Sequence, residues 1–340
     1  MGMIRLISGW TWTTARSRWI PTLLALALGC GAEGSGKRLL AIMPPGDTFL
    51  QAWSGMKSDL GGRYEWRVLD PDAKNAEDTL AALCATYAPH ALVLMDTRAV
   101  SLAKRMQKRD TALASLPKFI LMTLKAEDAA QELQGALGIR FEAPAYAVFT
   151  QLRALSGQEF TRIGVFHRRV FSPFVEESRR LLSREKLELI GKCLDCDGSG
   201  PPSESEIVKR LGRGMDEFRS ADVEVVWMLP DNTLVNPATL GRFWAPRFRR
   251  GTVPLIVPLA HLAGKQADLG LFSAYPDYYQ LGVQAAQQVV QVIEGSVQPS
   301  AIGFEPLISI QTTLNLGVAK RLRWEIRKDK LPRVGDLIQP

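Results

Sequence analysis

Polar and charged side chains follow several short apolar stretches of this chain, at the points where strands are expected to end. In open parallel sheets, ligands bind beyond the carboxyl ends of the strands, so these side chains are the first candidates for a binding site. Hydroxyl, amide and guanidinium groups there suit a small ligand that carries a carboxylate or another anionic group. The candidate ligand-binding residues are Asp47, Thr97, Arg98, Thr123, Arg168, Phe171, Asp231, Asn232 and His261.

Some of these residues also have a structural explanation, and the sequence leaves both explanations open. Asp47 and Asp231 each precede an expected helix, where a carboxylate commonly accepts hydrogen bonds from the first N–H groups. The ring of Phe171 can stack against a ligand or cover its own core. His90 opens an expected strand without an acidic neighbour, and we assign it a structural role.

The sequence lacks the motifs of common enzyme classes. It holds three histidines, no Gly-x-Ser-x-Gly or His-Glu-x-x-His motif, and no Gly-x-Gly-x-x-Gly between a strand and a helix. Residues 31–37 match the spacing of a phosphate-binding loop, but they precede a strand, and Arg38 follows them instead of serine or threonine. We therefore expect a binding protein that is not an enzyme and uses no cofactor or metal.

The four cysteines fall into three settings. Cys30 ends an apolar run near the start of the chain, and Cys84 lies in a helical pattern, where a buried, unreactive thiol is expected. Cys193 and Cys196 form a Cys-Leu-Asp-Cys segment, which favours a loop-closing disulfide in an exported protein. A redox-active pair and two separate thiols are the alternatives. A metal site would need two more ligands with matching spacing, and the sequence offers no second pair.

The first 30 residues resemble an export signal. Basic residues up to Arg18 precede an apolar run at 19–28, which is about half the roughly 20 residues that a membrane-spanning helix needs. The run ends in Ala-Leu-Gly-Cys at 27–30, which is typical of bacterial lipoproteins, whose cysteine thiol carries the lipid. We predict a lipoprotein signal peptide at 1–30 with lipid attachment at Cys30.

Two alternatives to the lipoprotein signal are an ordinary secretory signal cut near Ala32 and a short buried helix. Residues 31–37 are rich in glycine and are predicted to form a flexible tether. Gly31 after the cysteine, instead of aspartate, favours the outer of two bacterial membranes.

The composition is that of an ordinary globular protein, with 46% hydrophobic and 23% charged residues. The net charge is +7, but the first 30 residues contribute three basic residues and no acidic one, so the rest of the chain carries +4. A small excess spread over so many residues is not the basic patch of a nucleic-acid-binding protein, and we expect no such partner.

The elements that must position the candidate residues alternate between short apolar strands and amphipathic helices. This pattern indicates βαβ units that form a parallel sheet. Its recurrence after residue 160 indicates a second doubly wound unit that follows the first. The predicted fold class is α/β, with two doubly wound parallel-sheet lobes. The predicted strands are 38–43, 64–69, 91–95, 119–122, 162–166, 187–190, 223–229 and 253–257, and the longest predicted helices are 48–60, 76–87, 174–186, 204–218 and 277–294.

Four segments carry a resemblance to a known family: 226–234 (Val-Trp-Met-Leu-Pro-Asp-Asn-Thr-Leu), 253–257, 271–287 and 313–322. Its most specific part is the helix that contains Gly282, followed by Asn315 and Ala319. On these residues the chain, from about 38 to 332, resembles the substrate-binding proteins of ABC transporters, a family that includes tryptophan- and tyrosine-binding lipoproteins.

The resemblance implies a type I periplasmic-binding fold, in which two lobes are joined by three crossings and hinge closure traps the ligand. It places the 277–294 helix on the first lobe. The implied lobes are 38–155 with 276–304, and 156–275 with 305–335.

The resemblance also implies ligand contacts from Thr97 and Thr123 on the first lobe and from Phe171, Asp231 and Asn232 on the second. The chain departs from the family at two turns. Asp-Thr-Arg at 96–98 replaces a turn rich in small residues, and Leu-Lys at 124–125 replaces an expected Asp-Pro.

We therefore expect an extracytoplasmic solute-binding lipoprotein of an ABC importer that binds a small anionic or zwitterionic organic solute between its lobes. Its expected partners are the solute, the permease and ATPase subunits, and the membrane through the N-terminal lipid. We expect a monomer in the periplasm. The alternative is a ligand-sensing lipoprotein that reports to a membrane kinase or receptor.

Overall fold

The computed structural model describes residues 36–198, 200 and 202–340. The predicted signal peptide, Cys30 and most of the tether lie outside the described residues. Within the described part, no helix combines the length and apolar character needed to cross a membrane.

The first sheet has six strands in the order β11-β5-β4-β3-β1-β2, and all of its strand pairs are parallel. Its central strand β3 is buried at every position, as expected for the run Ala-Leu-Val-Leu-Met between two helical layers. The strands are β1 (Lys37–Ile42), β2 (Tyr64–Leu69), β3 (Ala91–Met95), β4 (Lys118–Leu121), β5 (Ala136–Ile139) and β11 (Phe304–Glu305).

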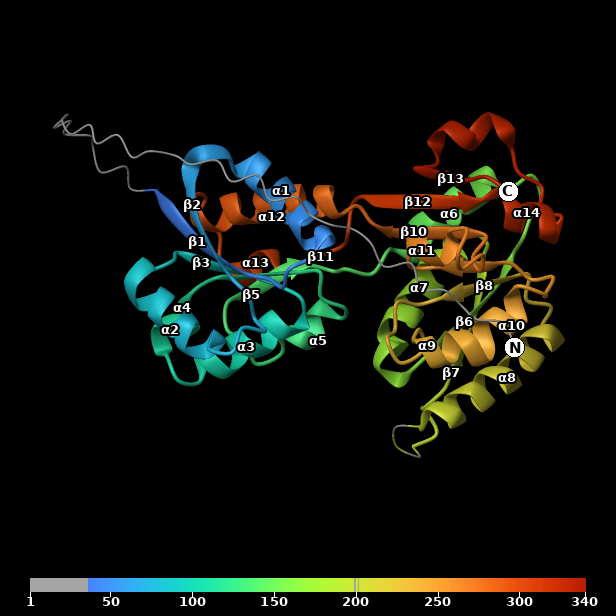
Figure 1. Ribbon diagram of the computed structural model, residues 1–340, viewed down its shortest axis with the longest axis horizontal. Coiled ribbons are helices and arrows are strands. Elements are labelled where there is room, and N and C mark those ends of the chain that lie inside the picture. The colour runs from blue at the N-terminus through green and yellow to red at the C-terminus, as the bar shows by residue number, and fades with distance from the viewer. Residues whose placement is uncertain (1–35, 199, 201) are drawn as a thin grey trace, which may run out of the picture. The chain divides into compact units, whose positions relative to one another are not determined.

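Helices cover both faces of the first sheet, and a separate apolar cluster fills the space on each face. Figure 1 shows α1 and α12 together on one side of this sheet and α2, α3 and α4 on the other. The helices are α1 (Asp47–Leu60), α2 (Ala76–Tyr87), α3 (Thr97–Gln107), α4 (Thr111–Ser115), α5 (Ala126–Ala130), α12 (Tyr278–Ile293) and α13 (Pro299–Ile302).

The second sheet has seven strands in the order β13-β12-β10-β9-β8-β6-β7, and only the β10–β12 pair is antiparallel. It too has an apolar cluster on each face. Its strands are β6 (Arg162–His167), β7 (Glu188–Cys193), β8 (Val225–Met228), β9 (Leu255–Val257), β10 (Phe272–Pro276), β12 (Ile310–Asn315) and β13 (Asp336–Ile338).

Seven α-helices accompany the second sheet among the described residues. They are α6 (Ala145–Leu155), α7 (Ser172–Arg184), α8 (Glu204–Ser220), α9 (Pro237–Thr239), α10 (Ala245–Phe248), α11 (Ala260–Ala263) and α14 (Leu316–Leu322). Short 3₁₀ turns occupy Gly61–Arg63, Arg169–Phe171 and Lys328–Arg333, and a π-helical turn occupies Leu240–Trp244.

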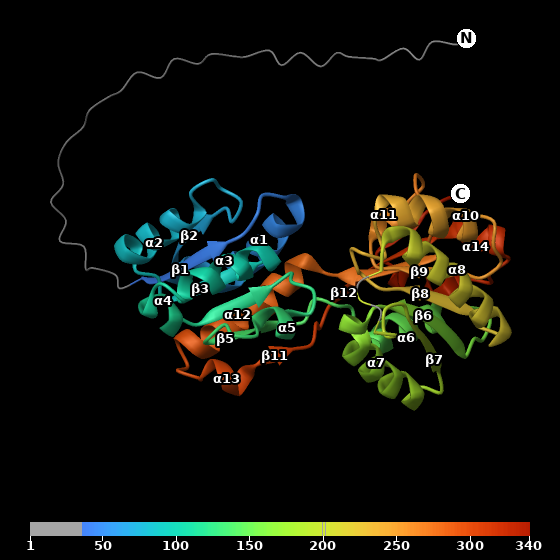
Figure 2. The same cartoon turned by 90° about the horizontal axis from the view of Figure 1, so that it is seen from below.

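The chain passes three times between the two sheets: after β5, after β10 and after β11. Figure 2 shows the two sheets as separate groups of strands, with α12 beside the first. The prediction of two α/β lobes of the type I periplasmic-binding class is confirmed. The first crossing lies earlier than the predicted boundary at 155, because α6 buries Val148, Phe149 and Leu152 in the core of the second sheet.

The pairing of α12 with α1 depends on two glycines. A Cβ at Gly282 would lie 1.9 Å from the carbonyl oxygen of Ala52, and a Cβ at Gly55 would lie 2.0 Å from that of Tyr279. Only glycine allows two helix backbones to approach so closely. These contacts bring the α12 segment, far along the sequence, back to the first sheet, as the resemblance implies.

Candidate functional site

A cavity of about 360 Å³ lies between loops of the two sheets, and we call it the interlobe cavity. Its walls come from residues that follow β3, β4, β6 and β8, so the carboxyl ends of strands from both sheets meet there. This is the place where open α/β sheets bind ligands. The lining residues are Thr97, Leu124, Lys125, Asp128, Ala129, Arg168, Phe171, Asp231 and Asn232.

Arg168 and Asp231 form a two-point ion pair on the second-sheet wall. Arg168 Nε donates to Asp231 Oδ2 at 2.7 Å, and Nη2 donates to Oδ1 at 2.9 Å. The backbone N–H of Thr233 also donates to Oδ1, at 2.9 Å. The Asp231 side chain is 1% exposed, and its hydrogen bonds raise the pKa of the Arg168 guanidinium. Because Nε and one hydrogen of Nη2 are used, Nη1 and the second hydrogen of Nη2 remain as donors toward a ligand.

Lys125 supplies a cation from the first-sheet wall. Its Nζ lies 5.7 Å from the centre of the Phe171 ring, so a cation–π contact links the two walls. Among the described residues, no acidic partner is found within ion-pair distance of this ammonium group. Lys125 therefore has charge to offer to an anionic ligand.

The backbone of Lys125 is held by a buried carboxylate. Lys125 has a left-handed conformation with φ of 50°, and its N–H donates to Glu142 Oε1 at 2.6 Å. Glu142 is 7% exposed, and its burial raises the pKa of the carboxyl group. The turn that presents Lys125 to the cavity therefore depends on a residue from the segment that follows β5.

At the start of α3, Asp96 caps the helix by accepting the N–H of Arg98 at 2.9 Å. The same carboxylate accepts Arg98 Nη2 at 2.8 Å, and Nη1 of Arg98 bonds to Asp72. These contacts hold Arg98 on the exposed side of the first lobe, while its neighbour Thr97 lines the interlobe cavity.

The structure brings together five of the nine predicted binding residues: Thr97, Arg168, Phe171, Asp231 and Asn232. The other four lie outside the cavity lining. Thr123 is fully buried and donates to the carbonyl of Leu121 at 3.1 Å. Asp47 and His261 are exposed in the first turns of α1 and α11, and Arg98 is paired as described above.

The candidate list from the sequence omitted Leu124, Lys125, Asp128 and Ala129, and residues 124–125 stood out in the sequence only as a departure from the family. All four belong to or flank α5, a five-residue helix that is too short to show an amphipathic period. The only sequence indication was their position after an apolar strand.

For Phe171 the sequence left two alternatives open, stacking against a ligand and covering its own core. Its ring is 2% exposed and belongs to the apolar cluster of the second sheet, yet it also lines the cavity beneath Lys125. The ring therefore is part of the core and also one wall of the cavity.

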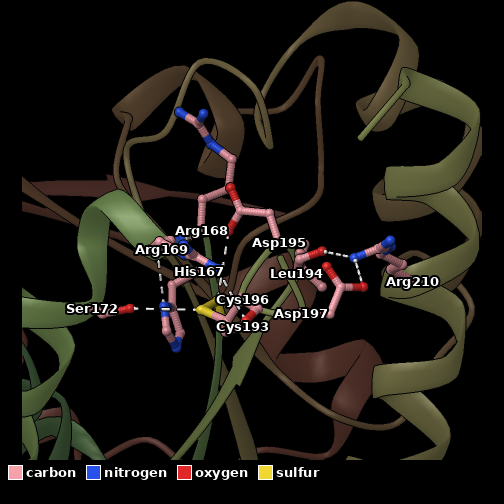
Figure 3. The surroundings of a disulfide bond; sticks show 10 residues. All are labelled: His167, Arg168, Arg169, Ser172, Cys193, Leu194, Asp195, Cys196, Asp197 and Arg210. Carbon is pink, nitrogen blue, oxygen red and sulfur yellow. Dashed lines mark hydrogen bonds and ion pairs between the residues drawn. A yellow bond between two sulfur atoms is a disulfide. The ribbon is translucent and has the colours of Figure 1, made fainter. Parts of the chain in front are cut away.

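Cys193 and Cys196 are joined by a disulfide at the end of β7, beside the 167–172 segment that carries Arg168 and Phe171 (Figure 3). Asp195, inside the disulfide loop, accepts the N–H of Arg169 at 2.5 Å, and the carbonyl of Cys196 accepts Arg169 Nη2 at 3.1 Å. The loop therefore supports the backbone next to Arg168. Cys84, by contrast, is partly buried, and burial raises the pKa of its thiol to about 11.

Taken together, the cavity presents one ammonium group, one guanidinium donor and a buried carboxylate around an aromatic ring. Among the lining residues there is no pair of nucleophile and base at hydrogen-bond distance. This arrangement suits the binding of a small polar molecule.

The fold has close parallels among solved structures. The ligand-free, open structure of a substrate binding protein with adhesive properties from Clostridium difficile matches 89% of this chain and 100% of its own, with a TM-score of 0.60 at 12% sequence identity. The ABC domain in complex with L-Trp from Streptococcus pneumonia matches 88% of this chain and 99% of its own, with a TM-score of 0.54 at 17% identity.

This chain has the type I periplasmic-binding fold. A conserved domain protein from Vibrio cholerae matches it with a TM-score of 0.53 at 15% identity, over 89% of this chain and 99% of the other. No protein-family model matches the chain, and no curated protein matches it. At these identities the likeness concerns the fold, so the function of a type I periplasmic-binding chain has to be argued from its own cavity.

Proposed function

We propose that this protein is an extracytoplasmic solute-binding protein that holds a small anionic or zwitterionic organic solute in the interlobe cavity. The proposal rests on the positions of the charged side chains on the two walls of the interlobe cavity. Within the described part of the chain, the Lys125 ammonium group on one wall has no acid at ion-pair distance, and Arg168 on the other wall has unused donors beside the buried Asp231 carboxylate. A solute carboxylate fits the two cations, and a solute amine fits the exposed carboxylate of Asp128.

The mechanism is binding coupled to closure of the two lobes. A solute that contacts Lys125 and Arg168 at the same time interacts with both walls only when they are close, so it stabilises the closed arrangement. Closure also excludes water, which strengthens each charged hydrogen bond to the solute. The solved structures described above, one with L-Trp and one of a substrate binding protein, are consistent with this use of the fold.

We further propose that the protein is a lipoprotein, anchored through Cys30, that delivers its solute to the permease and ATPase subunits of an ABC importer as a periplasmic monomer. The support is the Ala-Leu-Gly-Cys box after a short apolar run. Replacing Cys30 by serine should release the protein from the membrane fraction, and retention of the variant there would contradict the anchor.

The decisive experiment identifies the solute. Native mass spectrometry of gently purified protein should show a bound species of defined mass that is lost on partial unfolding. Titration calorimetry with that compound should then show weaker binding to a Lys125→Met variant, by about tenfold or more, because a charged hydrogen bond is lost.

Lys57→Met is a matched control, because Lys57 Nζ also lies over an aromatic ring, that of Trp53, at 6.0 Å, but outside the interlobe cavity. Its affinity should equal that of the unaltered protein. Chemical turnover of the bound compound, or equal weakening by the Lys57 and Lys125 variants, would contradict the proposed function.

A further inference from the structure

A second cavity, of about 520 Å³, lies in the second lobe at the opposite end of strand β8 from Asp231. It is bordered by the last turns of α8, by α10 and by the segments that lead into β8 and β9. We call it the distal cavity. Its volume lies within the range of about 300–1,000 Å³ that is typical of small-molecule sites. The lining residues are Met215, Phe218, Arg219, Asp222, Val223, Val226, Arg247, Phe248, Gly251, Thr252 and Val253.

The floor of the distal cavity is apolar. Met215, Phe218 and Val223 reach it from the end of α8 and the following turn, Val226 from β8 and Phe248 from α10. All five belong to the apolar cluster on this face of the second sheet and are less than 9% exposed. A ligand here would rest an apolar body on side chains that are already packed together.

The rim carries cations that are only partly compensated. Arg219 Nη1 and Arg247 Nη2 both approach the same oxygen of Asp216, at 3.5 and 3.4 Å. Two guanidinium groups therefore share one carboxylate at the long end of the hydrogen-bond range. Asp222, the acid among the lining residues, is 86% exposed and is paired with Arg162 at 3.6 Å.

One donor on this rim is unsatisfied. Arg247 Nε is buried, and no acceptor for it is found within the described residues. Buried polar groups in native proteins are nearly always hydrogen-bonded, so an orphaned guanidinium donor beside a cavity indicates an acceptor that the chain itself does not supply. A carboxylate in the cavity would compensate the excess charge of Arg219 and Arg247.

We propose that the distal cavity is a second binding site, separate from the interlobe cavity, for a small amphiphilic monocarboxylate. Its carboxylate pairs with Arg247 and Arg219, and its apolar chain lies over Phe218 and Phe248. The site does not depend on the proposed transport function, because it shares no lining residue with the interlobe cavity.

Octanoate is the probe for this proposal, with 1-octanol as its uncharged counterpart. Titration calorimetry on the full chain should show saturable binding of octanoate and binding of 1-octanol that is at least about tenfold weaker, because the charged hydrogen bond is missing. Arg247→Met should weaken octanoate binding by a similar factor.

Arg242→Met is the matched control. Arg242 makes one comparable contact, at 3.4 Å to Glu204, but does not line the distal cavity. Lys125→Met, on the first-sheet wall, tests whether the probe enters the interlobe cavity instead. Both variants should bind octanoate as the unaltered protein does.

Thr252→Trp provides a second test that leaves the arginines in place. Thr252 is exposed at the cavity, so an indole there should obstruct the site without disturbing the core. It should abolish octanoate binding while the thermal unfolding midpoint stays near its original value. The proposal is overturned if octanoate does not bind, if 1-octanol binds equally well, or if Lys125→Met removes the binding that Thr252→Trp leaves intact.

Discussion

The Arg168–Asp231 pair should contribute strongly to the stability of the second lobe, and a double-mutant cycle can measure this. The two residues are 63 positions apart and are joined by hydrogen bonds of 2.7 and 2.9 Å. The perturbations are Arg168→Met, Asp231→Asn and the two together. Methionine retains the apolar stem of arginine, and asparagine retains the shape of aspartate, so each change removes the charge and its hydrogen bonds while keeping most of the packing.

The expected coupling free energy follows from how deeply the Arg168 and Asp231 side chains are buried. Removing one partner of a fully buried ion pair costs about 3–5 kcal/mol, and a hydrogen bond to a charged group contributes about 1.5–3 kcal/mol. Asp231 is 1% exposed but Arg168 is 26% exposed, so water compensates part of the loss at the arginine. We expect a coupling free energy of about 2 kcal/mol between the two positions.

Urea denaturation followed by circular dichroism measures the free energy of unfolding of all four proteins. The exposed Arg242–Glu204 pair, with side chains 56% and 51% exposed, is the control. Its coupling should stay below about 0.5 kcal/mol. A coupling at Arg168–Asp231 as small as that of the control would refute the reasoning, since it would mean that burial of the carboxylate adds nothing to the pair.

Further predictions concern groups away from the ligand contacts. Burial raises the folded-state pKa of Glu142. The contribution of Glu142 to the free energy of unfolding is therefore present below its ordinary pKa and is lost as the pH rises through the raised value. Glu142→Gln should remove this pH dependence of the free energy of unfolding, as measured by urea titrations at a series of pH values. Lys118→Met should destabilise the first lobe by about 2–3 kcal/mol, because Nζ of this fully buried side chain donates to three backbone carbonyls at 2.8–3.0 Å. An unchanged free energy of unfolding would contradict a stabilising role of these hydrogen bonds. Reduction of the Cys193–Cys196 disulfide with dithiothreitol should lower the free energy of unfolding by no more than about 2 kcal/mol, because the loop that it closes is short. The exchange rate of backbone amide hydrogens should rise in the adjacent 167–172 segment, which the loop supports. Gly282→Ala should prevent α12 from packing on α1, because the new Cβ would lie 1.9 Å from a backbone oxygen, and a variant with native thermal stability would show that the helices can separate at little cost.

Much of the fold could be predicted from local pattern. The strands at 64–69 and 91–95 were predicted with the bounds that the structure shows, and most of the others within about two residues. Short apolar runs between amphipathic helices are a local property, since burial on both faces of a parallel strand demands apolar side chains at every position. Strands β5, β10, β11, β12 and β13 were not predicted, because they are either very short or carry glycine, serine, threonine, glutamine or proline in place of a continuous apolar run.

The candidate site was predictable only in part. The rule that ligands lie beyond the carboxyl ends of strands led to Thr97, Arg168 and Asp231, because the position of a residue after a strand can be read from the sequence. The same rule included Thr123, whose side chain turns into the core, and the sequence does not encode that direction in any local pattern.

The sequence by itself determined the class of fold and the candidate residues at the strand ends, because both depend on the spacing of apolar and polar residues along neighbouring turns and strands. The tertiary structure decided which of these residues meet. Arg168 is paired with a carboxylate 63 residues away and keeps only part of its donors for a ligand, whereas Lys125 lies over an aromatic ring and keeps its charge available. Arg98, equally basic, is paired with Asp72 and Asp96 instead. Such pairings depend on contacts between segments that are distant in the chain, and those contacts exist only once the sheets and helices have packed.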